Sequence, residues 1–147
     1  MSDNFYPFID QLSQQFSNVN INAPLPLYRE IGWDFQKAMP LVVNNEFKTV
    51  EGNEAIAVWI WHAIKTYRYA FSVYSWDFGS ELDTLLGQNY TQELTKSEAK
   101  RYIEEALLIN PYILTLDRIE VTFNNGLLDI NLRATTVYKE LEVSFIV

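Results

Sequence analysis

The chain carries two groups of closely spaced carboxylates, one around a predicted turn and one along a predicted helix: Asp77, Glu81 and Asp83, then Glu98, Glu104 and Glu105. A glycoside hydrolase needs two carboxyl groups about 5 to 9.5 Å apart, one of them with a raised pKa. Simpler explanations exist here, because Asp77 would end a strand, Glu98 would complete a capping box, and the others would lie on solvated helix faces. We therefore predict no catalytic residue and no enzymatic activity, with a peptidoglycan hydrolase as the alternative.

Other catalytic chemistry is restricted by the single histidine and the absence of cysteine. Without cysteine the chain forms neither a disulfide nor a thiolate metal site. A serine triad would have to use His62, which lies beside Trp61 on a predicted helix, where a histidine is more often a surface or interface residue. Walker, GxGxxG and HExxH motifs are missing. We predict no metal and no cofactor.

Composition predicts one soluble domain. The chain has 147 residues, of which 48% are hydrophobic, and these are enough to build a core. Its longest apolar run, residues 55–61, is far shorter than the roughly 20 residues that span a bilayer. The N-terminus lacks a basic leader. We expect no membrane partner and no export signal.

The charge is acidic, with 19 acidic and 11 basic side chains and a net charge of −8. The basic residues are dispersed rather than gathered in a stripe, which argues against a nucleic-acid partner. Acidity of this kind serves either solubility or a partner with a basic face. The sequence alone does not separate the two.

Three segments show helical signals. The first begins at Gly52-Asn53 and repeats apolar residues at helical spacing: Ile56, Trp59, Ile60, Ala63, Ile64 and Tyr67. On its opposite face, Trp61 is either covered by the N-terminal segment or offered to a partner. A short helix follows the turn at residues 77–80, and a third begins with a capping box at Thr95-x-x-Glu98 and ends at Asn110-Pro111.

Strand signals lie on both sides of these helices. Residues 27–35 and 47–50 suggest a hairpin around a turn at residues 44–45, and residues 70–74 are rich in strand formers. Alternating residues at 119–123 and 128–134 flank Asn125-Gly126, which favours a type I′ hairpin turn. A further strand covers residues 140–147. The predicted fold is α+β, with helices packed on one face of a mainly antiparallel sheet and C-terminal β-hairpins.

Residues 1–26 are predicted to form an N-terminal arm, with residues 27–147 as the domain proper. The arm combines polar residues with four aromatic ones, Phe5, Tyr6, Phe8 and Phe16, and ends in two prolines that favour extended structure. A polar loop is the alternative. Four aromatic side chains favour a segment that packs on its own domain or on a neighbour.

Residues 54–88, EAIAVWIWHAIKTYRYAFSVYSWDFGSELDTLLGQ, and 98–113, EAKRYIEEALLINPYI, follow one another in a recognisable order. Together with LYREIGWDFQ at residues 27–36, this order resembles the gene-25-type baseplate wedge proteins, the sheath initiators of contractile phage tails, and their Gram-positive prophage and tailocin relatives. The resemblance runs from about Tyr28 to Val147. It implies a structural, non-catalytic role in the baseplate.

The resemblance also assigns motif positions: Thr66 and Arg68 match a Thr-x-Arg step, Asp77, Phe78 and Gly79 a turn, and Pro111 the centre of a Glu-Pro-Arg motif. Here the flanking residues are Asn110 and Tyr112, so an ion pair that the family forms with those two side chains is not expected. From the residues themselves we expect Arg68 to form an ion pair with Asp77. Gly79 is expected to have a positive φ because the turn is tight.

A strand at the end of the chain offers backbone groups for β-augmentation. With Trp61, the predicted protein-binding residues are therefore in this strand: Leu141, Val143, Ser144, Phe145 and Val147. The resemblance implies sheath protein and other wedge proteins as partners, with the tail tube as a further neighbour and six copies around the tail axis. It also implies a place in a virion or tailocin baseplate after synthesis in the bacterial cytoplasm. From the residues themselves we expect a monomer in isolation, because the core elements are complete and Glu140 and Glu142 discourage self-pairing. A small acidic adaptor remains a further alternative.

Overall fold

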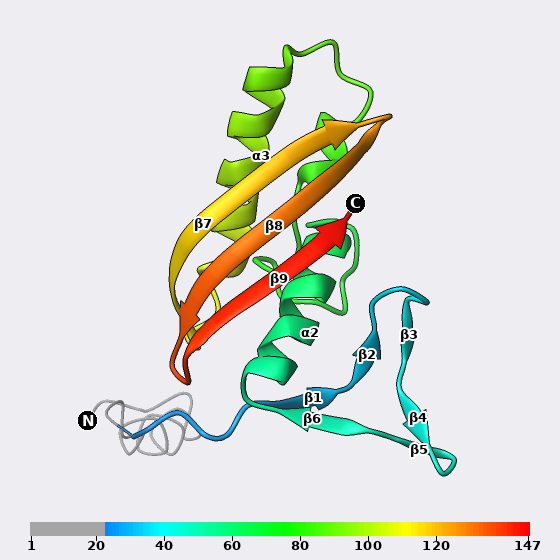
Figure 1. Cartoon of the computed structure of the whole chain (residues 1–147), viewed down its shortest axis with the longest axis vertical. Coiled ribbons are helices and arrows are strands. Elements are labelled where there is room, and N and C mark those ends of the chain that lie inside the picture. The colour runs from blue at the N-terminus through cyan, green and yellow to red at the C-terminus, as the bar shows by residue number, and fades with distance from the viewer. Residues whose placement is uncertain (1–22) are drawn as a thin grey trace, which may run out of the picture.

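The computed structural model describes residues 23–147. Most of the predicted arm, including its four aromatic residues, lies outside the described residues. The described part contains a C-terminal sheet, two α-helices with a short 3-10 helix, and a set of short strands near its start (Figure 1).

The C-terminal sheet is antiparallel and has the order β7 (Ile113–Asn124), β8 (Leu127–Thr136) and β9 (Glu140–Ile146). Asn125 and Gly126 connect β7 to β8 with φ values of 49° and 82°. A type I′ turn needs a positive φ at both central residues, so the predicted turn is confirmed. Along β8 the even-numbered residues are buried, whereas the odd-numbered ones are more exposed. The sheet therefore has one core face and one outer face, as the alternating sequence predicts.

Helices α2 (Asn53–Lys65) and α3 (Gln92–Leu107) cover the core face, α2 behind β9 and α3 behind β7 and β8 (Figure 1). The 3-10 helix η1 (Leu82–Leu85) packs beside α3. The largest fully buried side chains come from α2, η1, α3 and β8: Ile56, Ile60, Leu82, Ile103, Leu107, Leu128 and Ile130. This is the predicted α+β class, held by a shared apolar layer between helices and sheet.

The boundaries and faces of the helices differ from prediction in three places. Helix α2 ends at Lys65, so Tyr67 is 56% exposed rather than buried. Val58 lies outside the predicted apolar series of this helix but is buried, because it packs in a second small cluster with Val50. Helix α3 begins at Gln92, where the Thr91 hydroxyl oxygen accepts a hydrogen bond from the Leu94 N–H at 3.3 Å. The predicted capping box one turn later is therefore wrong.

The short strands pair as three small ladders: β1 (Arg29–Ile31) with β6 (Thr49–Glu51), β2 (Trp33–Asp34) with β3 (Met39–Pro40), and β4 (Val42–Val43) with β5 (Glu46–Phe47). The predicted hairpin turn is present, with φ values of 53° and 65° at Asn44 and Asn45. The strand predicted at residues 27–35 is instead divided at Gly32, whose backbone binds two different segments. Gly32 N–H donates to the Lys48 carbonyl at 2.7 Å, and Leu41 N–H donates to the Gly32 carbonyl at 2.8 Å.

Residues 67–78 form a loop, which we name the aromatic loop, and the strand predicted at residues 70–74 is wrong. The segment has strand-forming side chains, but among the described residues no strand pairs with it. Tyr69 has a φ of 65°, which turns the chain away from an extended path. Strand propensity depends on a neighbouring strand and a surface to cover, and this segment has neither.

Candidate protein-binding edge and motif loop

Strand β9 lies at the edge of the sheet and pairs with β8 on one side only. Leu128 and Val147 exchange both backbone hydrogen bonds, at 2.9 and 2.8 Å. In an antiparallel ladder such doubly bonded pairs recur at every second residue. The odd-numbered residues of β9 therefore direct their backbone groups toward β8, and the even-numbered residues from 140 to 146 direct theirs toward the open edge.

Both ends of this open edge are capped by side chains of α2. The Asn53 amide donates to the Glu140 carbonyl at 3.1 Å, and the Lys65 ammonium donates to the Ile146 carbonyl. No further hydrogen bond within residues 23–147 uses the outward backbone groups of Glu142 and Ser144. The free part of the edge is thus a window centred on these two residues.

A groove of about 650 Å³ lies beside the C-terminal end of this window. It is lined by the turn after β2, by α2, by the start of β8 and by the end of β9: Phe35, Gln36, Ala38, Trp61, Lys65, Asp129, Ser144, Phe145 and Ile146. The rings of Phe35 and Phe145 meet edge to face, with centroids 6.0 Å apart. The structure therefore places three predicted binding residues, Trp61, Ser144 and Phe145, around one hollow. Leu141, Val143 and Val147 instead pack against the core and support the strand from below.

Trp61 is half-buried, and within residues 23–147 it is covered by β2 and the turn that follows. Its ring lies 5.4 Å from that of Trp33 and 6.2 Å from that of Phe35. His62 packs edge-on against Trp33 at 4.5 Å, and burial lowers the pKa of its imidazole. This histidine joins an aromatic cluster on α2, and the cluster forms one wall of the groove.

The motif residues Thr66, Arg68 and Gly79 come together at the neck of the aromatic loop. Ser80 N–H donates to the Thr66 carbonyl at 2.9 Å, and Arg68 N–H donates to the Ser80 carbonyl at 3.1 Å. Gly79 has a φ of 106°, in agreement with the expected positive value, and a Cβ there would lie 2.8 Å from the Thr66 carbonyl oxygen. Only glycine combines this φ with so close an approach of two backbone segments.

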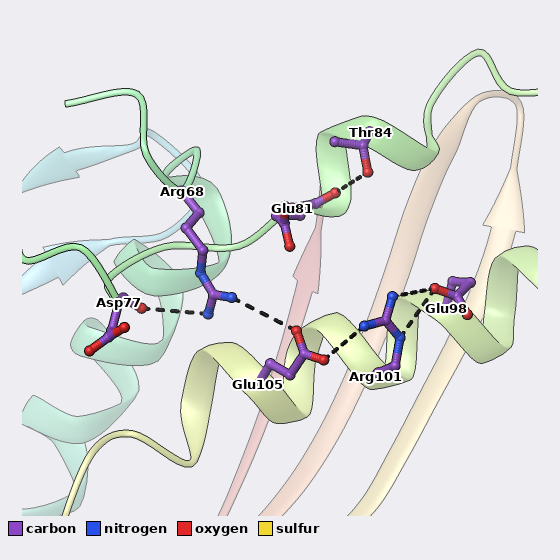
Figure 2. Close-up of polar contacts among 7 residues, drawn as sticks. All are labelled: Arg68, Asp77, Glu81, Thr84, Glu98, Arg101 and Glu105. Carbon is purple, nitrogen blue, oxygen red and sulfur yellow. Dashed lines mark hydrogen bonds and ion pairs between the residues drawn. The ribbon is translucent and has the colours of Figure 1, made fainter.

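Arg68 does not form the predicted ion pair with the Asp77 carboxylate. Its guanidinium lies 3.5 Å from the Asp77 backbone carbonyl and 3.8 Å from the Glu105 carboxylate on α3 (Figure 2). The side chain is only 10% exposed, and its Nε is buried without a partner among the described residues. Arg68 thus braces the neck of the loop against α3. The prediction was wrong because local sequence gives no sign that α3 approaches.

Two of the carboxylates considered for hydrolysis are bound to one arginine. Arg101 donates to Glu98 at 2.6 Å and to Glu105 at 2.8 Å, and these hydrogen bonds raise the pKa of the arginine (Figure 2). A glycoside hydrolase needs a carboxyl group placed to protonate its substrate, whereas both of these carboxylates are bound by the same guanidinium. The geometry therefore gives these two residues a role in tying α3 together rather than in catalysis.

Asn110 and Tyr112, which replace the charged residues of the Glu-Pro-Arg motif, form a turn and an aromatic contact. The Asn110 side-chain oxygen accepts from the Tyr112 N–H at 3.0 Å. Tyr112 is buried, its hydroxyl donates to the Pro26 carbonyl at 2.8 Å, and its ring lies 4.6 Å from that of Tyr28. Pro111 follows the end of α3 as predicted. Tyr112, at the position of the motif arginine, therefore holds residues 26–28 against the end of the sheet.

Residues 29–139 match the family described as contractile injection system sheath initiator. The match covers about three quarters of the chain. The protein belongs to this family. The protein is also 39% identical over 80 residues to the phage-like element PBSX protein XkdS of Bacillus subtilis (strain 168). That alignment spans 54% of this chain and 55% of the relative, so the chain spans about half the length of the curated relative it matches.

Family membership supports a structural role in the baseplate or tail of a contractile particle, and it agrees with the resemblance on which the sequence prediction rests. The family match ends at residue 139, just before β9. The properties of the open edge therefore come from the structure of this chain. They are not supplied by the family match.

Sequence reasoning missed Asn53 and Lys65 as caps of β9 and Ser80 as the residue that closes the loop neck. Asn53 and Lys65 are distant in sequence from the backbone groups that they bind, by 87 and 81 residues. A helix that begins with Asn and ends with Lys is unremarkable on its own. The signal appears only when α2 is placed beside β9.

Among residues 23–147, no group of three or more His, Cys, Asp and Glu side chains is arranged to hold a metal ion. In the same part of the chain, no helix has the length and apolar character needed to cross a membrane.

Proposed function

We propose that the protein is a baseplate component of a contractile tail or related injection machine and that it initiates sheath assembly by strand addition. It joins the wedge near the tail tube, and sheath protein adds a strand to the open edge of β9. The partners in this proposal are sheath protein and other wedge proteins, with the tail tube as a further neighbour. Six copies surround the tail axis, in a virion or tailocin baseplate whose parts are made in the bacterial cytoplasm.

The observation that supports strand addition is the free window in the edge of β9. Backbone hydrogen bonds supply affinity in β-augmentation, and side-chain pockets fix the register. Glu142 and Ser144 offer the backbone groups, and the groove beside Phe145 offers a pocket. The two capped carbonyls, at Glu140 and Ile146, limit how far an added strand can slide.

The isolated protein should be a monomer, because its core is complete and the open edge carries two glutamates that discourage self-pairing. Sedimentation at several concentrations measures this. A hexamer of the protein alone, stable across concentrations, would contradict the proposal. An adaptor function is distinguished more simply, because genes for sheath, tube and wedge proteins beside this one favour the baseplate role.

Ser144→Pro is the decisive substitution. The Ser144 N–H points to the open edge, so proline removes a donor for an added strand and leaves the hydrogen bonds between β8 and β9 in place. We expect a folded protein that still enters the baseplate, and particles whose tubes lack a sheath. Electron microscopy of particles that carry the variant provides the measurement.

Ser144→Ala is the matched control. Alanine removes the hydroxyl, which donates to the Asn131 side-chain oxygen at 2.6 Å, but keeps the backbone N–H. Particles with this variant should carry normal sheaths. Normal sheaths on Ser144→Pro particles would instead show that another edge starts the sheath.

A further inference from the structure

The two faces of the open edge of β9 differ in chemistry. On the core side, an added strand would meet the groove formed by Phe35, Trp61 and Phe145. On the outer side it would meet Glu140 and Glu142, whose side chains are exposed. Because side chains alternate along a strand, one incoming strand would meet both surfaces at once.

Charges on the outer face of the sheet are arranged in pairs up to this edge. Arg118 on β7 contacts Glu120 on the same strand, and Arg133 on β8 binds Glu142 on β9, with its Nε 2.6 Å from the carboxylate. Within the described residues, no cation forms an ion pair with Glu140. Glu142 is thus already paired within the sheet, whereas Glu140 gives the outer face of β9 a negative charge that a basic side chain on a further strand could balance.

We propose, on the basis of the function proposed above, that the β9 edge selects a partner strand with basic side chains on one face and a bulky apolar side chain on the other. The basic residues lie beside Glu140 and Glu142, because directly neighbouring opposite charges on a sheet face attract. The apolar side chain enters the groove beside Phe35 and Trp61, where it covers the exposed part of the Phe35 ring.

A second copy of this chain fits the edge less well. If two β9 strands paired in antiparallel fashion through the same window, the glutamates of both copies would share one face of the joined sheet. Like charges in neighbouring positions oppose such pairing. The outer face therefore selects against self-association and for a basic strand.

Two designed eight-residue peptides test this selection with the full chain. Both alternate valine and phenylalanine on one face, and the other face carries lysine in one peptide and glutamate in the other. Titration of the isotope-labelled protein, followed by the amide signals of residues 140–146, gives the two affinities. The lysine peptide should bind roughly tenfold more tightly, because exposed ion pairs each contribute little and two of them change sign. This preference should shrink to about twofold in 1 M salt.

The double variant Glu140→Gln and Glu142→Gln should remove the preference, whereas Glu120→Gln, on the same face but on β7, should leave it intact. Equal affinities, no binding of either peptide at this edge, or an equal loss in the Glu120 control would overturn the inference. Ser144→Pro particles report separately on sheath initiation. Bare tubes without a peptide preference would refute only the charge selection, and normal sheaths with the preference would refute only the sheath role.

Discussion

The C-terminal sheet and the aromatic loop both contain many strand-forming side chains and have opposite fates. These side chains are mainly β-branched in the sheet and mainly aromatic in the loop. Strand β9, however, has β8 beside it and α2 behind it. The aromatic loop has neither, and Val73 and Trp76 in it are 82% and 77% exposed. Strand-forming residues therefore made a strand here only where a neighbouring strand could satisfy the backbone.

The loop is instead organised by aromatic pairs and by its closed neck. The rings of Tyr69 and Trp76 lie 5.3 Å apart, and those of Tyr74 and Phe78 lie 4.8 Å apart. Phe78 in turn meets Trp59 of α2 at 5.9 Å. The loop is thus attached to the core at its ends, while its tip remains exposed. The sheet depends on many hydrogen bonds, and the loop depends on a few contacts at one place.

Gly79→Val should lower the stability of the protein most, because it disrupts the neck on which the aromatic loop depends. The new Cβ would meet the Thr66 carbonyl oxygen at 2.8 Å, and valine is strained at a φ of 106°. Strain and overpacking together should lower the free energy of unfolding by roughly 3 kcal/mol. Urea denaturation measures the loss.

Gly87→Val is the matched control, because its φ is 78° and nothing lies within 4 Å of an added Cβ. It carries the backbone strain without the clash and should cost only about 1 to 2 kcal/mol. Equal losses in the two variants would mean that the neck is not a close approach of two segments. The conclusion that the loop depends on contacts at its neck would then be wrong.

The sequence predicted the sheet better than the loop for physical reasons. Alternation at residues 119–123 and 128–134 and the Asn125-Gly126 turn are local signals, and local geometry decided that hairpin. At residues 70–74 the local signal was strand-forming composition alone, and the deciding factor was a partner strand, which lies outside the local sequence.

The same limit applies to the candidate site. The alternation along β9 predicted which residues face the core, and the register agrees with it. It did not predict that Asn53 and Lys65 would cap the edge or that Arg68 would approach Glu105 instead of the Asp77 carboxylate. These contacts depend on how helices pack on the sheet, which no short motif encodes.

The packing of Tyr28 at the end of the sheet can be tested through the pH dependence of stability. Its ring packs on Tyr112 at the end of the sheet, and burial, followed by the nearby Glu30 charge, raises its pKa to about 12. The folded state thus favours the neutral phenol, so this contribution to stability is complete below about pH 10 and is lost as pH rises toward 12. Tyr28→Phe should therefore lose less stability than the parent between these pH values. Urea denaturation midpoints of both proteins, measured across this pH range, provide the test. Midpoints that fall equally in the variant and the parent would contradict the prediction.

Trp76→Ala should have the smallest effect, and it examines the loop tip directly. The side chain is 77% exposed and touches mainly Tyr69, so its removal should change the free energy of unfolding by no more than about 0.5 kcal/mol. Trp59→Ala is the comparison within α2, because that ring packs against the core and Phe78, and its loss should cost roughly 3 kcal/mol. Denaturation midpoints of the two variants measure the difference. If Trp76→Ala cost as much as Trp59→Ala, the tip would be part of the folded core, and the aromatic loop would resemble the sheet in stability despite having no strand partner.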